Sequence, residues 1–127
     1  DILLSEDFSK CTGVKDPDNP TIKMDGKMDD YTNVPGWTCV NGYAGEGNTK
    51  FGTASKAGSV TTPSVDLSDA TATYTLKFRA CAWNGDATTL KITVDDQEAV
   101  EVEGLTNSAK PYAPNLKEFS VQIKGTR

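Results

Sequence analysis

The feature that most constrains this chain is a strict two-residue alternation from Thr71 to Trp83. The even positions are apolar or aromatic: Ala72, Tyr74, Leu76, Phe78, Ala80 and Ala82. The odd positions are mostly polar: Thr71, Thr73, Thr75, Lys77, Arg79, Cys81 and Trp83. Because successive side chains of a strand point to opposite faces, this pattern predicts a long strand with one apolar face. The 16 threonines of the chain also favour strands, since β-branched residues are restricted in helices.

The C-terminal half continues with three shorter alternating segments. Asn84-Gly85-Asp86 is a turn sequence, and Thr88–Asp95 alternates after it, so we expect the long strand and Thr88–Asp95 to form a hairpin. Asp95-Asp96-Gln97 is a second turn signal, followed by alternation at Val100–Val102. Phe119–Ile123 alternates last. This half is therefore predicted to hold four strands.

The N-terminal half is less regular. Short strands are expected in four ranges, 2–4, 37–43, 49–54 and 59–62, and residues 11–36 read as an extended loop with turn residues. No segment has a helical pattern, and the total reaches about eight strands. Many short strands separated by turns indicate an all-β fold, an antiparallel β-sandwich or jelly roll in a single domain spanning 1–127.

Charge and composition exclude several classes of function. The chain has 127 residues, with 13 Lys and Arg against 18 Asp and Glu, for a net charge of −5. Nucleic-acid binding is not expected, because it depends on clustered Lys and Arg. The absence of histidine excludes Ser-His-Asp triads and His-liganded zinc. No apolar run approaches the ~20 residues that a membrane-spanning helix needs, so membrane insertion is not expected.

Three segments and the predicted hairpin resemble a known group of domains. The segments are Leu3–Phe8, Gly36-Trp37 and Gly58–Ser68. In this order they are similar to cleaved-adhesin or choice-of-anchor jelly-roll domains, which have a galactose-binding-like fold and occur in surface and secreted proteins of anaerobic Gram-negative bacteria. The resemblance implies a non-catalytic accessory domain that binds a glycan or another surface partner, within a larger exported polypeptide that is secreted, periplasmic or at the cell surface.

Members of that group usually continue into one more strand, whereas this sequence ends at Lys124-Gly125-Thr126-Arg127. Either the last strand lies outside this sequence or the fold closes differently. The N-terminal Asp1, with no leader sequence before it, is expected to be the start of a mature or trimmed chain.

Aromatic residues are the candidates for sugar binding, because a flat ring stacks on the apolar face of a sugar while nearby polar groups bond its hydroxyls. Trp83 ends the long strand on its polar face, and Trp37 precedes a glycine-rich segment. The candidate ligand-binding residues are Trp83, Trp37, Arg79, Asn84, Asp86 and Tyr43. For each tryptophan the alternative is a role in the core. Tyr31 and Tyr112 lie in predicted loops and could rim a site.

Carboxylates raise the possibility of a structural calcium ion, which binds oxygen ligands. The resemblance places such ligands at Glu6 and Asp7. Two alternative groups are Asp16 with Asp18, and Asp25 with Asp29 and Asp30. Solvated acidic turns are the competing interpretation. A glycosidase would need two carboxylates across a cleft, and nothing selects two of the 18 acidic residues, so the chain is not expected to be an enzyme.

Three cysteines allow at most one intramolecular disulfide. Cys11 and Cys39 bracket the long loop and could be bridged, with Cys81 left as a thiol. Alternatively all three are reduced and packed as small apolar groups.

The expected function is a carbohydrate-binding or adhesion module that contacts a glycan or a cell-surface protein. One alternative is a structural spacer beside a catalytic or anchoring domain. Another is a protein-binding module that uses an exposed strand edge, since unpaired edges are templates for another chain.

Overall fold

A computed structural model describes residues 1–95, 97–107 and 109–126. The chain divides into two compact units, Asp1–Asp66 and Leu67–Arg127, which we describe separately. In the described residues all nine strands lie in antiparallel sheets and the helical content is limited to two single 3₁₀ turns, η1 (Met28–Asp30) and η2 (Ala113–Asn115). The predicted all-β class is confirmed, and the arrangement is consistent with a β-sandwich. The jelly-roll topology stays a prediction.

The first unit contains two small sheets. One has three strands in the order β1 (Ile22–Lys23), β3 (Gly42–Ala44) and β4 (Thr49–Phe51). The other pairs β2 (Thr38–Val40) with β5 (Ser59–Thr61). The segment 37–43 was predicted to be one strand broken by Gly42. It forms two strands of different sheets, and the break lies one residue earlier, at Asn41, which has a φ of +55°.

Four buried residues form the core of the first unit: Cys11, Met24, Met28 and Ala44. Partly buried side chains pack around them: Phe8, Ile22, Tyr31, Trp37, Cys39 and Phe51. Most of the central residues come from the segment 11–36, which was predicted to be a surface loop. That prediction is wrong in part, because the segment supplies β1, η1 and the two buried methionines.

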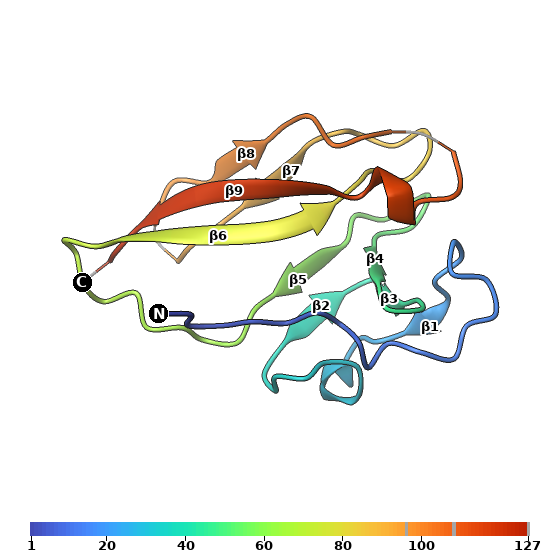
Figure 1. Cartoon of the computed structure of the whole chain (residues 1–127), viewed down its shortest axis with the longest axis horizontal. Coiled ribbons are helices and arrows are strands. Elements are labelled where there is room, and N and C mark those ends of the chain that lie inside the picture. The colour runs from blue at the N-terminus through green and yellow to red at the C-terminus, as the bar shows by residue number, and fades with distance from the viewer. Residues whose placement is uncertain (96, 108, 127) are drawn as a thin grey trace. The chain divides into compact units, whose positions relative to one another are not determined.

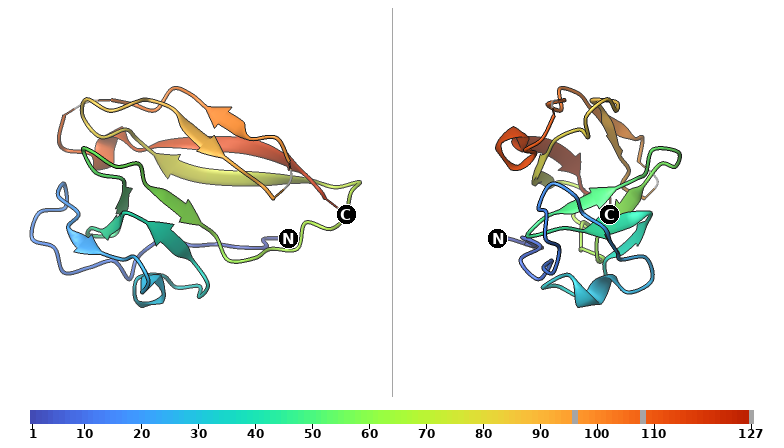
Figure 2. Two further views of the ribbon diagram at one scale, coloured as in Figure 1. Left: turned by 180° about the vertical axis from the view of Figure 1, so that it is seen from behind. Right: turned by 90° about the vertical axis from the view of Figure 1, so that its right-hand side faces the viewer.

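The second unit is built on a long ribbon of two strands. β6 (Thr73–Ala80) pairs antiparallel with β9 (Lys117–Lys124) over eight residues, and the two run side by side in Figure 1. A second ribbon pairs β7 (Leu90–Ile92) with β8 (Val100–Val102). It lies next to the first in both views of Figure 2. On β6 the even residues are partly buried and the odd residues exposed, as the alternation predicts.

The predicted hairpin between the long strand and Thr88–Asp95 is wrong. β6 pairs with β9, and β7 pairs with β8. Eight alternating residues of β6 find a partner of equal length and matching apolar face in β9, whereas β7 has only three residues. Burying complementary apolar faces sets strand register more strongly than closeness in the sequence.

The expectations for residues 2–4, for the turn at 95–97 and for membrane insertion have different outcomes. Residues 2–4 form no strand, and Ile2 is 83% exposed. The turn expected at 95–97 includes position 96, which lies outside the described residues, although the Gln97 N–H donates to the Val94 carbonyl at 2.9 Å. Position 127 of the C-terminal sequence is also outside them. In the part of the chain that is described, no helix is long and apolar enough to cross a membrane.

Candidate functional site

The aromatic pair Trp83–Tyr112 lies in the second unit. The two rings are stacked, with centroids 4.6 Å apart and an angle of 24° between their planes. Both side chains are partly buried. The Cys81 thiol points at the Tyr112 carbonyl at 3.9 Å, beside the stack. The sequence indicated Trp83 as a candidate and Tyr112 as a loop residue that could rim a site, but it did not predict that their rings stack.

A tight turn follows Trp83 directly. The Asp86 N–H donates to the Trp83 carbonyl at 2.9 Å, and Gly85 has a φ of +90°, a conformation that favours glycine. Asn107 holds this turn from a distant segment. Its Oδ1 accepts from the Gly85 N–H at 3.1 Å, and its Nδ2 donates to the Asp86 carbonyl at 2.6 Å. The turn therefore has a defined shape although it is exposed.

Sequence reasoning missed Asn107, because a single asparagine in an irregular segment carries no signal. Two neighbouring contacts position it: the Ala82 N–H donates to the Thr106 carbonyl at 2.9 Å, and Ala82 and Asn107 form an isolated parallel bridge. Trp83, Asn84, Asp86, Asn107 and Tyr112 thus form one local group, which we call the Trp83 site.

Arg79, the fourth candidate in this unit, is exposed on β6 and lies opposite Glu118 of β9. It lies four positions before Trp83 in the sequence, and β6 ends between the two at Ala80. In the described part of the chain, no hydrogen bond or ion pair joins the Arg79 side chain to the Trp83 site, and the role of Arg79 in ligand binding stays a prediction.

Trp37 lies in the first unit and is part of its core packing. Its ring contacts that of Phe8, with centroids 5.5 Å apart, and its Nε1 is buried without a hydrogen-bond partner among the described residues. One side of the residue borders a hollow of about 300 Å³, lined also by Lys27, Met28 and Asp29. Trp37 and Trp83 belong to different units and are separate candidates.

Tyr43 lies between two lysines on neighbouring strands. Lys23 and Lys50 are its cross-strand partners, and their Nζ atoms lie 5.8 and 4.9 Å from the centre of its ring. Cations over an aromatic face are attracted by the ring quadrupole. This packing gives Tyr43 a local structural role on the outer face of the three-stranded sheet.

Glu6 anchors the N-terminal segment to the chain at Asn33. Its carboxylate accepts the backbone N–H groups of Phe8, Asn33 and Val34 and the side-chain amide of Asn33, all at 2.8–3.0 Å. Burial alone raises the pKa of Glu6, but the hydrogen bonds from Asn33, Val34 and Phe8 together lower it below its ordinary value. Glu6 therefore works as a charged acceptor for a loop whose N–H groups lack strand partners.

Asp7, the second predicted calcium ligand, accepts the Ser9 N–H at 3.0 Å and the Asn33 amide at 2.8 Å. Hydrogen bonds from Ser9 and then from Asn33 lower its pKa. N–H donors thus approach the oxygens that a metal ion would need. No group of three or more His, Cys, Asp or Glu suited to a metal occurs in the described ranges, and calcium binding here stays a prediction.

We expect the role of Glu6 to appear in the pH dependence of stability. Because its pKa is lowered in the folded chain, its contribution is present above its ordinary pKa of 4.5 and is lost as the pH falls through the lower folded value. Glu6→Gln should reduce the free energy of unfolding by about 1 kcal/mol at pH 7 and by much less at pH 3.

Urea unfolding of both proteins at pH 7, 5 and 3 measures this difference. Glu103→Gln, which changes an exposed carboxylate on the other unit, is the matched control and should leave stability within about 0.5 kcal/mol at each pH. An equal loss at pH 7 and pH 3 for Glu6→Gln would contradict the charged-acceptor role.

All three cysteines are free thiols, so the structure favours the reduced alternative over a Cys11–Cys39 bridge. Burial, with a smaller effect of the Glu6 charge, raises the pKa of Cys11 to about 11. Burial and the neighbouring Asp25 raise the pKa of Cys39 to about 11. Protonated thiols are poor nucleophiles and metal ligands, which suits a packing role.

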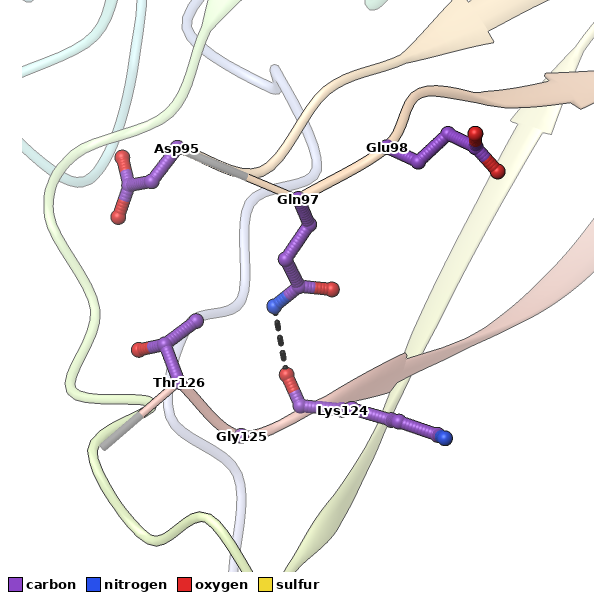
Figure 3. Close-up of a pocket in the computed structure, with 6 residues that line it drawn as sticks. All are labelled: Asp95, Gln97, Glu98, Lys124, Gly125 and Thr126. Atoms are coloured by element: carbon purple, nitrogen blue, oxygen red, sulfur yellow. Dashed lines mark hydrogen bonds between the residues drawn. The ribbon is translucent and has the colours of Figure 1, made fainter.

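A wider hollow of about 640 Å³ lies where the loop between β7 and β8 meets the end of β9 (Figure 3). Asp95, Gln97, Glu98 and Lys124 line it with polar groups. The Gln97 Nε2 donates to the Lys124 carbonyl at 2.8 Å across it. None of the described residues that line it is aromatic, so this lining offers no flat apolar surface for a sugar ring.

Comparisons with known proteins give no relative. No protein-family model matches the chain, and neither the curated proteins nor the solved structures contain a match. The resemblance to cleaved-adhesin domains therefore stays a prediction.

Proposed function

We propose that this chain is a non-catalytic carbohydrate-binding or adhesion module of a surface or secreted protein, and that the Trp83 site contacts the sugar. The stacked pair of Trp83 and Tyr112 carries the proposal. Paired aromatic rings at a partly exposed position offer an apolar surface for the C–H face of a sugar ring.

The polar groups of the turn support the same function. Asn84 and Asp86 are exposed directly after Trp83, and neither side chain has a hydrogen-bond partner in the described part of the chain. An amide and a carboxylate beside an aromatic surface are the groups that bond sugar hydroxyls. Because Asn107 already holds the turn in shape, this loop would lose little conformational entropy when a sugar binds.

The partner class follows from this chemistry. A shallow aromatic surface with two polar side chains fits one or two sugar units at the end or along the side of a glycan, presented on a cell surface. Trp37 and Tyr43 are secondary candidates, because packing within the first unit accounts for much of both rings.

Glycan-array binding followed by calorimetry with the best-binding oligosaccharide tests the proposal. Trp83→Ala should weaken binding by roughly thirtyfold, since a central aromatic contact is worth about 2 kcal/mol. Trp83→Phe should retain part of the affinity, and Asp86→Ala should lose about tenfold through its hydrogen bonds.

Phe51→Leu is the control, because it removes an aromatic ring of the other unit that is not a candidate for sugar binding. Circular dichroism must show that each variant is folded. Unchanged binding by folded Trp83→Ala would reject the Trp83 site. No glycan bound by the wild-type chain would favour the structural-spacer alternative.

A further inference from the structure

The edge of β9 that faces away from β6, its outer edge, has no strand partner among the described residues. It is eight residues long, whereas every strand other than β6 and β9 has two or three residues. β6 and β9 hydrogen-bond to each other, and no other strand of the described residues pairs with either. An eight-residue edge presents a row of N–H and C=O groups that can pair with another strand. A two-stranded ribbon is also only marginally stable by itself in water.

The register shows which groups of β9 face outward. The Gly125 N–H donates to the Ala72 carbonyl at 3.0 Å, which continues the ladder one residue past the Thr73–Lys124 pair. In an antiparallel ladder, alternate pairs carry the bonds between the strands, so the even residues of β9 turn their backbone groups outward. The Lys124 carbonyl is one of these outward groups, and it accepts from the Gln97 side chain at 2.8 Å.

The outward residues of β9 are complementary to a reversed copy of themselves. They are Glu118, Ser120, Gln122 and Lys124, all exposed. If a second β9 pairs antiparallel with Val121 opposite Val121, then Glu118 of each copy lies opposite Lys124 of the other, and Ser120 lies opposite Gln122. Opposite charges and hydrogen-bonding side chains in directly opposed positions stabilise strand pairs.

The same register also continues the apolar face. Phe119 would lie opposite Ile123 of the second copy, and the two Val121 side chains would face one another. Within each chain Phe119 already stacks on Phe78 of β6, with centroids 5.6 Å apart. The β6–β9 ribbons of the two copies would then form one four-stranded sheet with one polar and one apolar face.

The outer edge of β6 lacks this complementarity. By the same alternation its outward residues are Thr73, Thr75, Lys77 and Arg79, two of them cationic and none acidic. Two copies of this edge paired about Leu76, the residue opposite Val121 in the ribbon, would place Thr73 opposite Arg79 and Thr75 opposite Lys77. The four cations would then lie on one face with no acidic side chain opposite any of them.

We propose that two copies of this chain form a twofold symmetric dimer by pairing the outer edges of their β9 strands, with Val121 at the centre. The contact is isologous, as in most small homodimers. Gln97 occupies one lone pair of the Lys124 carbonyl at each end of the edge, and the second lone pair remains for the partner strand. The dimer is independent of the proposed sugar site.

Charge exchange tests the register. Sedimentation equilibrium of the full chain should show a monomer–dimer equilibrium. Glu118→Lys places two lysines opposite one another at both ends of the interface, and Lys124→Glu does the same with two glutamates. Each variant alone should dimerise at least about tenfold more weakly than wild type. An equimolar mixture of the two should recover a 1:1 heterodimer, because the opposed charges are then complementary again.

A mixture of Glu103→Lys and Lys91→Glu has the same net charges as that pair but changes exposed residues away from β9, and it should show no preference for heterodimers. A wild-type chain that remains monomeric at 1 mM, far above the concentration range of specific dimers, overturns the proposal. If the control mixture also preferred heterodimers, the proposed register would be wrong, because any pair of oppositely charged variants would then associate non-specifically.

A proline pair tests the edge itself. Gln122→Pro removes an outward N–H of β9 and leaves the ladder to β6 intact, so it should abolish dimerisation. Thr75→Pro is the matched control, since Thr75 lies opposite Gln122 and turns its N–H to the other edge of the ribbon. Both lose the same Thr75–Gln122 side-chain contact of 3.4 Å. If both variants were folded and lost the dimer equally, the dimer contact would not be at the outer edge of β9.

Discussion

Met24→Ala should lower the free energy of unfolding of the first unit by about 2–5 kcal/mol, the usual cost of removing a large buried side chain. Met24 has no exposed surface and forms the buried apolar cluster of the first unit together with Cys11, Met28 and Ala44. A core of this size has few other side chains that could move into the space. The cavity would therefore persist, and the cost should lie toward the upper part of the range.

The chain offers a way to measure this unit by itself, because Trp37 and Trp83 lie one in each unit. In a Trp83→Phe background, the fluorescence of Trp37 alone follows urea unfolding of the first unit. Ile2→Ala is the control, since Ile2 is 83% exposed and its truncation should change stability by less than about 0.5 kcal/mol. A loss below about 1 kcal/mol for Met24→Ala would contradict a packed core around it.

Gly58→Ala should destabilise the same unit by about 3 kcal/mol. A Cβ at position 58 would run into the backbone nitrogen of Gly52 and the carbonyl carbon of Phe51, and would lie 2.8 Å from the Gly52 Cα. Backbone atoms cannot rotate away as the end of a side chain can, so the loop and the end of β4 must shift. Overpacking of this kind costs 1–3 kcal/mol, and occasionally more.

Gly47→Ala separates this close approach from the conformational freedom of glycine. Gly47 has a φ of +72°, but a Cβ there would meet no atom within 4 Å, so only backbone strain of about 1–2 kcal/mol is expected. Urea unfolding followed by Trp37 fluorescence measures both variants. If Gly58→Ala lowered the free energy of unfolding no more than Gly47→Ala does, the backbone around Gly52 and Gly58 would have to shift at little cost, which would contradict the prediction.

The strands of the second unit were predictable because their side chains alternate. The even residues of β6 are partly buried and the odd residues are exposed, as the sequence pattern predicts. The partner of β6 was not predictable, because a two-residue period says which face is apolar but not which other strand covers or extends it. A turn sequence at Asn84-Gly85-Asp86 favoured β7, yet equal length and matching faces select β9.

The first unit was harder to predict for a related reason. Met24 and Met28 lie in a segment rich in turn residues and charge, where no alternation marks them as core. Such a segment can enter a core only when side chains satisfy its irregular backbone. Glu6 does this for Asn33 and Val34, and Asp25 accepts the N–H groups of Asn41 and Gly42, both at 2.8 Å.

For the candidate site, the sequence alone identified Trp83 and the turn that follows it, because an aromatic residue at a strand end beside polar turn residues is visible in the order of residues. Tyr112 and Asn107 join that site only through the fold, which brings distant segments against it.

The sequence by itself determined the all-β class, the face of each long strand and the lack of histidine chemistry, since these follow from residue type and local period. Only the tertiary structure decided the strand partners, the unpaired edge of β9 and the stacking of Tyr112 on Trp83. Those features depend on contacts between residues far apart in the chain, for which local patterns carry no information.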